Sequence, residues 1–504
     1  MAAPSGVDLS IMQPVSLHPA PSVGSLAGPQ PEMPEDARLR TRGFLIVLAL
    51  WSPWLAALAV SMWKTPFPVN ETVALLEDVQ KATRSFFDPT LRSWYRPLYF
   101  TTYDWLLRGT GSIDGTLVGF RILEIAAPLA LVVLLLWHLR PRTLLEAGAA
   151  TCAVAVLVGT PGLRENLEIP LLMTLVGMPL ALIVWMLLTR APRPWHGLAI
   201  VVLTLVAIGY KEQGLAIAPV VVVAWWTRAP GAGTRVTVAV VASVVAYLAF
   251  RFAWNQNWPV FEQAVGLGFQ WVDRDNAIAR FGAFPYWMYA YNAMSTILNV
   301  LFSEPTSGMF IIVGDVINSR VEPWEIVHVV SSVSLTVTIA WWAVRVIPGI
   351  GRDGWSPDGR VALAFIAALL GSGALAYLYS RDRHGGMAAV FYALAAYAAV
   401  RHLAVRVASA DSTSRSRLAL AASLLAVVTV TWHVRAVGTL EWTRRMSQAN
   451  SVAWLVQMPQ RRVRFADRDV YLATMNHMFA QGTSSDAERP TNYPRTVSGM
   501  LLPR

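Results

Sequence analysis

Long apolar runs separated by short polar clusters dominate the sequence. Each run holds about 17–22 residues with few charges, which is the length that an α-helix needs to cross the apolar core of a bilayer. The pattern predicts an all-α polytopic membrane protein with about eleven transmembrane helices. The predicted spans are residues 43–62, 118–139, 143–160, 170–189, 197–210, 213–227, 235–253, 327–347, 360–379, 386–400 and 417–434.

The composition supports this fold class and excludes a water-soluble globule for most of the chain. Only 14% of the 504 residues are charged, against roughly 25% in an ordinary soluble protein. Hydrophobic residues make up 55%, and tryptophan, which favours membrane–water boundaries, occurs 21 times. Cys152 is the only cysteine, which excludes an intrachain disulfide and a cysteine-rich metal site.

Arginines between the apolar runs predict the orientation in the membrane. They cluster after alternate helices, as expected for a cytoplasmic face, and they account for the net charge of +10 without a nucleic-acid partner. Together with the high Ala, Val and Arg content, this predicts a multi-pass protein of a bacterial inner membrane with a cytoplasmic N-terminus. The arginines are Arg38, Arg40, Arg42, Arg140, Arg142, Arg190, Arg193, Arg228, Arg235, Arg345, Arg352, Arg360, Arg401, Arg406, Arg415 and Arg417.

One apolar stretch, 284–303, does not fit this alternation as a single crossing, because Arg345 and Arg352 would then lie outside. We expect it to be interfacial, re-entrant or paired with 307–319.

The chain divides into three parts. Residues 1–42, rich in Pro, Ser, Ala and Gly, are expected to form a disordered cytoplasmic tail. Residues 43–435 form the membrane domain, and 436–504 a small non-cytoplasmic segment. Two long outer loops, 63–117 and 252–326, are rich in aromatic residues and are expected to contain amphipathic helices along the membrane surface. Loops of this length usually have a function.

Acidic and basic residues are mixed at the predicted outer ends of the helices, whereas the clusters on the predicted cytoplasmic face are nearly all arginine. Arg and Lys can bind a phosphate, and a carboxylate can act as a general base or hold a divalent cation. Together they suggest transfer of a group from a lipid-linked phosphate at the membrane surface. The residues are Glu71, Glu77, Asp78, Arg96, Arg164, Glu165, Glu168, Lys211, Glu212, Arg381, Asp382, Arg383 and His384.

Structural interpretations of the same residues stay open. Glu71 can solvate the end of the first helix, and Glu77 can pair with Lys81 four residues on. Lys211 and Glu212 can form a local pair, and Arg381 to His384 can end a helix at the interface.

Several short stretches resemble the GT-C superfamily of membrane glycosyltransferases, and most closely its protein O-mannosyltransferase-like branch. The resemblance covers roughly residues 43–400, mostly as the order of helices and loops. Three departures are Asn70 where the family has a first acidic residue, Thr160 where it has His, and no Tyr directly after Arg381. The stretches are Pro68-Val69-Asn70-Glu71, Trp94-Tyr95-Arg96-Pro97-Leu98, Thr160-Pro161-Gly162-Leu163-Arg164-Glu165, Tyr210-Lys211-Glu212 and Tyr379-Ser380-Arg381-Asp382-Arg383-His384.

The resemblance implies a sugar donor linked to polyprenyl phosphate and transfer to a glycan, lipid or protein on the periplasmic side. By resemblance, Glu71 is the catalytic carboxylate, with Glu77 and Asp78 as alternates. It implies donor-phosphate binding by Arg381, Arg383, Lys211 and Arg96, with support from Glu165, Glu212, Asp382 and His384. No cofactor is certain; some members of the family use a divalent cation such as Mg²⁺ or Mn²⁺, and the sequence leaves this open.

Two other functions stay open at this point. A transporter or flippase of lipid-linked sugars also needs basic residues near a lipid phosphate, but it is expected to contain internal repeats and broken helices near the bilayer centre. A non-catalytic scaffold in envelope assembly needs none of the mixed clusters. A nucleotide-dependent ATPase is excluded because no phosphate-binding glycine-rich loop is found.

Overall fold

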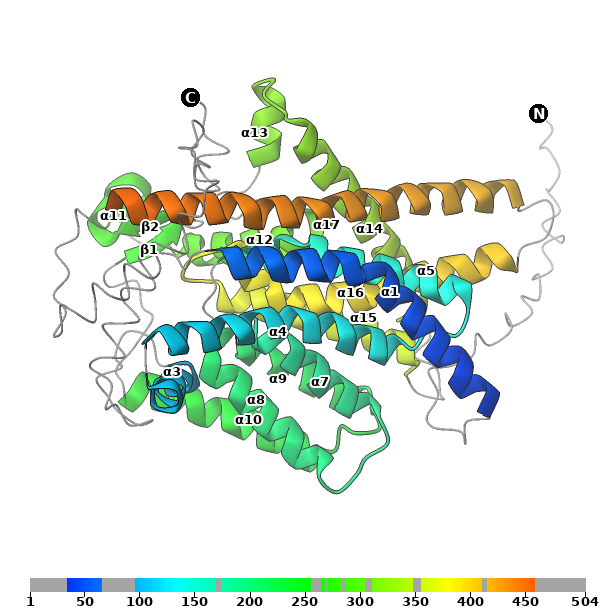
Figure 1. Cartoon of the computed structure of the whole chain (residues 1–504), viewed down its shortest axis with the longest axis horizontal. Helices are drawn as coiled ribbons and strands as arrows, with labels where there is room; N and C mark the ends of the chain where they lie inside the picture. Colours follow the sequence, from blue (N-terminus) through cyan, green and yellow to red (C-terminus); the bar gives the residue numbers. More distant parts are fainter. Residues whose placement is uncertain are drawn as a thin grey trace, which may run out of the picture.

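The chain folds as a multi-pass helical membrane protein, seen in a computed structural model (Figure 1). The structure describes residues 34–65, 96–111, 113–168, 175–254, 264–267, 270–282, 286–303, 311–347, 355–409 and 415–457.

Seven helices among these residues are long and apolar enough to cross a membrane. Each lies on a predicted span, because an apolar run of this length buries its backbone polar groups only as a helix. The helices are α1 (Pro34–Lys64), α4 (Ile113–Leu139), α10 (Thr234–Ala249), α14 (Pro323–Val346), α15 (Pro357–Leu375), α16 (Gly386–Ala408) and α17 (Arg415–Gln457).

Shorter apolar helices occupy the other predicted spans. A sharp bend of 56° separates α5 (Leu144–Gly159) from α6 (Pro161–Glu168), and the pair counts as an eighth span if it crosses as one unit. The remaining short elements are α7 (Gly177–Thr189), α8 (His196–Tyr210), the 3-10 turn η1 (Glu212–Ala216) and α9 (Ile217–Trp226).

Two helices extend beyond the predicted boundaries. The first, α1, begins at Pro34, within the part predicted to be a disordered tail. The last, α17, has 43 residues and continues past 435 to Gln457. Its extension packs along α1: the Trp54 indole donates to the Ala436 carbonyl (2.8 Å), and the Ser61 and Thr443 hydroxyls are 2.7 Å apart. These contacts between distant segments stabilise a helix that apolar length alone did not predict.

The two long loops that are predicted to lie outside contain helices, and also a feature that the all-α prediction missed. Strands β1 (Ala264–Leu267) and β2 (Gln270–Asp273) form an antiparallel hairpin. Four residues per strand are too few for a clear alternating pattern. The helical elements of these loops are α3 (Pro97–Thr110), the π-helical turn η2 (Phe250–Trp254), α11 (Arg274–Phe281), α12 (Trp287–Phe302) and α13 (Ile311–Ile317).

Helix α12 corresponds to the ambiguous stretch 284–303. It has 16 residues and is not among the seven candidate spans. One face buries the polar side chains of Asn292, Ser295, Thr296 and Asn299. This polar face packs inside the protein, where Asn292 donates to the Tyr377 carbonyl (3.0 Å) and Thr296 and Ser380 share a hydrogen bond (2.9 Å).

The centre of the bundle is formed by α5 and α16, which pack against each other. Almost every residue of α16 from 386 to 400 is buried, and α5 is equally buried over most of its length. Both helices are rich in alanine, and small side chains let helix backbones approach closely in membranes. The 3-10 turn η3 (Asp382–Gly385) directly precedes α16, so the rigid centre of the fold also positions η3.

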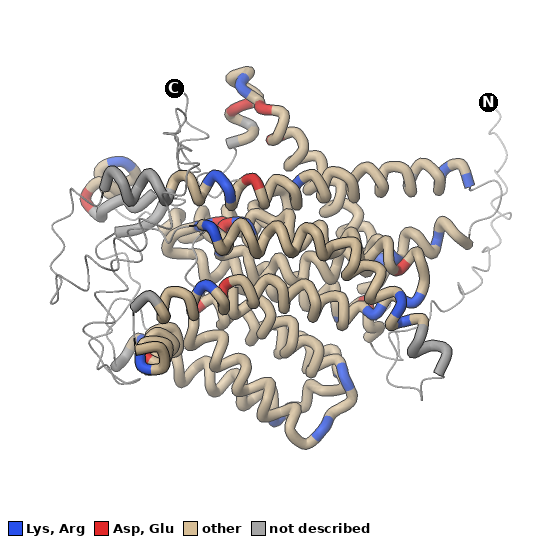
Figure 2. Tube along the Cα trace, viewed as in Figure 1, with Lys and Arg blue, Asp and Glu red and all other residues tan. Residues whose placement is uncertain are grey.

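Charged residues gather towards the two ends of the bundle, with long uncharged stretches between them (Figure 2). Lys and Arg prevail at the right-hand end in this view, as expected for the predicted cytoplasmic face. Acidic and basic residues are mixed towards the other end, to which the candidate site belongs.

A matched pair of cysteine variants tests this orientation. An added Cβ at Gly109 in α3 or at Gly233 before α10 meets no atom within 4 Å, so both positions tolerate cysteine. In a Cys152→Ala background, a membrane-impermeant maleimide added to intact cells is expected to label Gly109→Cys. Gly233→Cys is expected to react only after the membrane is opened. The reverse pattern would place the mixed charges in the cytoplasm and contradict the predicted orientation.

Candidate functional site

The structure brings together most of the mixed charges that the sequence placed at the outer helix ends. Arg96 precedes α3, and Lys211 and Glu212 lie between α8 and α9. Helix α6 carries Arg164 and Glu165. Arg381 directly precedes η3, which contains Asp382, Arg383 and His384. The predicted catalytic residue Glu71 and its alternates Glu77 and Asp78 lie outside the described residues. The roles assigned to all of these residues stay predictions.

A bidentate ion pair joins Arg96 to Glu212. The Arg96 Nε and Nη2 atoms lie 3.2 Å and 3.0 Å from the two carboxylate oxygens of Glu212, and both side chains are largely buried. Arg251, in the π-helical turn η2 that follows α10, lies 4.0 Å from the same carboxylate. Glu212 therefore orients the guanidinium of Arg96, which the sequence had assigned to a donor phosphate, and fixes the start of α3 against η1.

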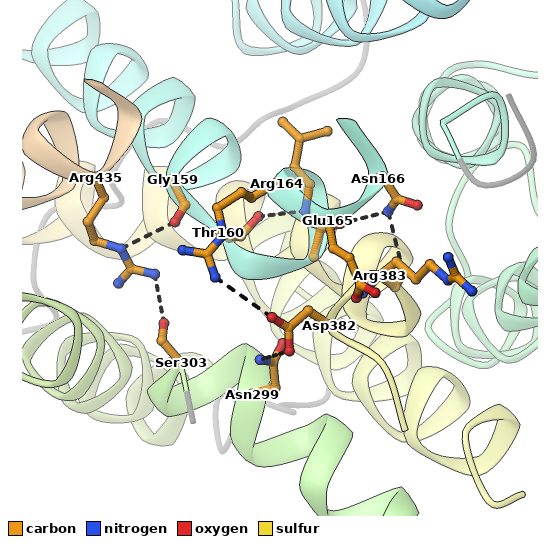
Figure 3. A network of polar contacts seen from close by, with 12 residues as sticks. Gly159, Thr160, Arg164, Glu165, Asn166, Asn299, Ser303, Asp382, Arg383 and Arg435 are labelled. Carbon is orange, nitrogen blue, oxygen red and sulfur yellow. Dashed lines mark hydrogen bonds and ion pairs between the residues drawn. The ribbon is translucent and has the colours of Figure 1, made fainter. Parts of the chain in front are cut away.

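Helix α6 and turn η3 form the second contact of the site (Figure 3). The backbone N–H of Arg383 donates to Glu165 Oε2 at 2.6 Å. Arg164 Nη2 lies 3.7 Å from Asp382 Oδ2, and the Asn166 amide donates to the Arg383 carbonyl at 3.4 Å. Three consecutive side chains of α6 thus bind the two residues that begin η3.

Helix α12 binds η3 from another side. The Asn299 amide donates to Asp382 Oδ1 at 2.9 Å, while Arg164 approaches the other oxygen of the same carboxylate. Asp382 is therefore held between α6 and α12, as Figure 3 shows. A carboxylate held by an arginine and an amide is fixed in orientation, which makes Asp382 a supporting residue of the site.

The bend between α5 and α6 places Arg164 and Glu165 at the site. Thr160 adopts an extended conformation (ψ 143°), because the proline that follows disfavours helical backbone at the preceding residue. Pro161 then opens α6, where a missing N–H costs nothing. Gly162 allows the close approach: a Cβ there would lie 3.0 Å from the backbone of Gly385 and Gly386.

Lys211 is the most unusual charge of the site. It is only 3% exposed, and no described residue forms an ion pair or hydrogen bond with its ammonium group. Burial lowers the pKa of Lys211 well below its usual value, the nearby cations of Arg383 and Arg96 lower it further, and the carboxylates of Glu212 and Glu165 oppose the shift. The lowered pKa favours the neutral amine, and an anion bound beside Lys211 would favour the charged ammonium.

Other polar atoms near Lys211 also have no partner among the described residues. Both amide atoms of Gln213 are buried in this state, and so is Nδ1 of His384, whose ring packs edge-on against Tyr379. Buried donors and acceptors are nearly always satisfied, and an unpartnered one indicates a bound ligand, an ion or water. Turns η1 and η3 therefore present polar groups that suit a polar, anionic ligand.

The acid–base cluster, as we name this group of charges, has more cations than anions among the described residues. The described part of the cluster holds six cations and three carboxylates, and Arg96, Arg381, Asp382 and Arg383 also take part in interactions beyond these. An anion bound here would reduce the repulsion between Lys211 and its neighbours. The cluster consists of Arg96, Arg164, Lys211, Arg251, Arg381 and Arg383 with Glu165, Glu212 and Asp382.

Sequence reasoning missed several polar neighbours, among them Asn299, Gln213 and Arg251. Asn299 had a usable signal, since the polar positions 292, 295, 296 and 299 recur at helical spacing within an apolar stretch. Gln213 directly follows Lys211 and Glu212 but has no charge to attract notice. Arg251 ends an apolar run, as many interfacial arginines do.

A metal site is not evident in the part of the chain that the structure describes, where no group of three or more His, Cys, Asp or Glu side chains could hold an ion. Glu71, Glu77 and Asp78 lie outside that part. The use of Mg²⁺ or Mn²⁺ therefore stays a prediction.

Comparison with protein-family models, with curated proteins and with solved structures gave no match for this chain.

Replacing Gly162 tests the contact between α6 and η3. The Cβ of Gly162→Ala would press on backbone atoms at 3.0 Å, so α6 and η3 must move apart. We expect a loss of about 1–3 kcal/mol, as for other overpacked sites, seen as a lower unfolding temperature in detergent. Gly148→Ala in α5 is the control, because its Cβ meets no atom within 4 Å. Equal unfolding temperatures for the two variants would show that the contact is loose.

Proposed function

We propose that the chain is an integral-membrane glycosyltransferase of GT-C type, which moves a sugar from a polyprenyl-phosphate carrier to an acceptor on the periplasmic face of a bacterial inner membrane. The single observation on which the proposal rests is the buried ammonium of Lys211. It lies in the acid–base cluster at one end of the helical bundle, where the carboxylates of Glu212 and Glu165 attract it but no described residue forms an ion pair or hydrogen bond with it.

A lipid-linked phosphate suits this place for two reasons. Its negative charge would pair with the Lys211 side chain, which has no ion-pair partner among the described residues, and its prenyl chain can lie among the apolar helices beside it. A soluble phosphate compound satisfies the first condition only. If each of the eleven apolar helices crosses the membrane, the arginine-rich connections lie on one side of the membrane and the acid–base cluster lies on the other.

The proposed reaction is a direct displacement at the anomeric carbon of the sugar. The bond between that carbon and the phosphate oxygen breaks, and its electron pair stays on the phosphate. A new bond forms between the carbon and the acceptor oxygen, with inversion at the sugar centre. The hydroxyl proton of the acceptor passes to a carboxylate, for which we propose Glu71, with Glu77 and Asp78 as alternates.

The cluster lowers the barrier by stabilising the leaving group. A phosphodiester carries one negative charge and becomes a phosphomonoester with a second charge as the sugar departs. Cations that already lie near the leaving oxygen stabilise that new charge without reorganisation. We assign this role to Lys211 and Arg383, with Arg381 beside them. Arg96, held by Glu212, contributes its field and orients the start of α3.

The assay that tests the proposal supplies a radiolabelled polyprenyl-phosphate sugar to the purified protein in lipid vesicles, together with extracted envelope material as acceptor. Wild type is expected to form a labelled product. Lys211→Met is expected to reduce kcat by about 10²–10³, the loss typical of removing one group that stabilises a developing oxyanion. Arg444→Gln is the control, because Arg444 is an exposed residue that pairs with Glu441 on the surface of α17.

Label that crosses the vesicle membrane without entering a new glycosidic bond would show a transporter instead. Equal rates for wild type and Lys211→Met would remove Lys211 from the mechanism.

Glu71→Gln tests the assignment of the base. The amide keeps the size of the side chain but accepts a proton poorly, so we expect kcat to fall by about 10²–10⁴, the usual contribution of a general base. Glu77→Gln and Asp78→Asn are the matched controls and are expected to stay near wild type. Loss of activity in either control, with Glu71→Gln active, would move the role to that residue.

A further inference from the structure

Arg435 is a buried cation on α17 that lies outside the acid–base cluster. Its guanidinium donates to the Gly159 carbonyl at 3.2 Å and to the Ser303 hydroxyl at 2.7 Å, both drawn in Figure 3. It also donates to the hydroxyls of Ser332 (2.7 Å) and Ser331 (2.9 Å) on α14. One side chain thereby joins α17 to the ends of α5 and α12 and to α14.

No described carboxylate pairs with Arg435, and the residue is only 4% exposed within a candidate membrane span. Burying a cation at such a place is costly and marks a functional residue more often than a purely structural one. Its guanidinium lies 3.7 Å from the ring centre of Trp432, which compensates part of the cost. Neutral side chains could fill the same volume at a lower cost in free energy. Packing alone therefore does not explain why an arginine is buried here.

Arg435 binds the ends of α5 and α12, and residues close to each of these ends contact Asp382 or Arg383. Gly159 is the last residue of α5 and precedes the bend into α6, where Arg164 and Glu165 contact η3. Ser303 caps the end of α12, one turn after Asn299, which donates to Asp382. Two series of contacts therefore connect Arg435 to η3, one through α5 and α6 and the other through α12.

We infer that Arg435 is a positioning residue for the acid–base cluster. By fixing the separation between the end of α5 and the end of α12, its guanidinium sets the gap that holds η3. Only arginine has five N–H donors in a planar arrangement that reaches several acceptors at once. The consequence for sugar transfer rests on the proposed function, whereas the effect on the order of η3 does not.

Hydrogen–deuterium exchange of the full-length protein in nanodiscs tests this inference without any assay of activity. In Arg435→Lys, peptides covering 160–168 and 379–386 are expected to exchange at least about tenfold faster, because hydrogen bonds to a charged group are lost. The peptide covering 196–210, on α8, is expected to keep its wild-type rate.

Thr439→Val is the matched control. Thr439 lies one turn further along α17 and donates to the Val158 carbonyl at 2.8 Å, so it binds the same end of α5 but not α12. We expect this variant to leave the exchange of 379–386 unchanged. Wild-type exchange of 379–386 in Arg435→Lys, or an equal rise in all peptides, would overturn the inference.

If Arg435→Lys does not fold, Ser303→Ala decides the question. This variant removes the hydrogen bond between Arg435 and the end of α12 and leaves Arg435 in place. We therefore expect faster exchange at 379–386 with little change at 160–168. Unchanged exchange at 379–386 would overturn the inference.

Sugar transfer measured on the same variants separates the two proposals. A wild-type protein that transfers no sugar contradicts the proposed function, and the exchange data still decide the role of Arg435. If transfer is observed, kcat of Arg435→Lys is expected to fall at least about tenfold, with Thr439→Val near wild type.

Discussion

The cost of burying charge in apolar surroundings determines how this protein is organised. Most of the chain avoids that cost by placing uncharged residues along the helices and charged ones at their ends. The acid–base cluster and Arg435 are exceptions, and each is held by contacts between segments far apart in the sequence. Arg96 and Glu212 are 116 residues apart, and Arg383 and Glu165 are 218 apart. Lys211 stands out because none of the described residues forms such a contact with its amino group.

The helices could be predicted because apolar length is a local property. Every predicted span contains a helix, although α1 and α17 extend further than expected. The extension of α17 depends on Trp54 and Ser61, more than 380 residues earlier in the chain, and no local pattern reveals such contacts. The hairpin β1–β2 was missed because its strands are too short to produce an alternating pattern.

The candidate site could be predicted in part, because mixed charge at helix ends is visible in the sequence. Lys211, Glu165 and the residues of η3 were identified in this way. Which charges pair with which was not predictable, and Arg96 is an example: it lies against Glu212 instead of standing free for a phosphate. Neutral partners such as Asn299 and Gln213 became visible only when the turns η1 and η3 were placed in space. The proposed base, Glu71, lies outside the described residues.

The proposed function of the cluster has one requirement, namely that an anion completes the charge around Lys211. A structure by electron cryomicroscopy of the protein in nanodiscs with added polyprenyl phosphate tests this most directly. The phosphate is expected within hydrogen-bonding distance of the Lys211 ammonium, between η1 and η3, with the prenyl chain against the apolar helices. Phosphate density bound elsewhere on the protein, or an empty site at saturating lipid, would contradict the account.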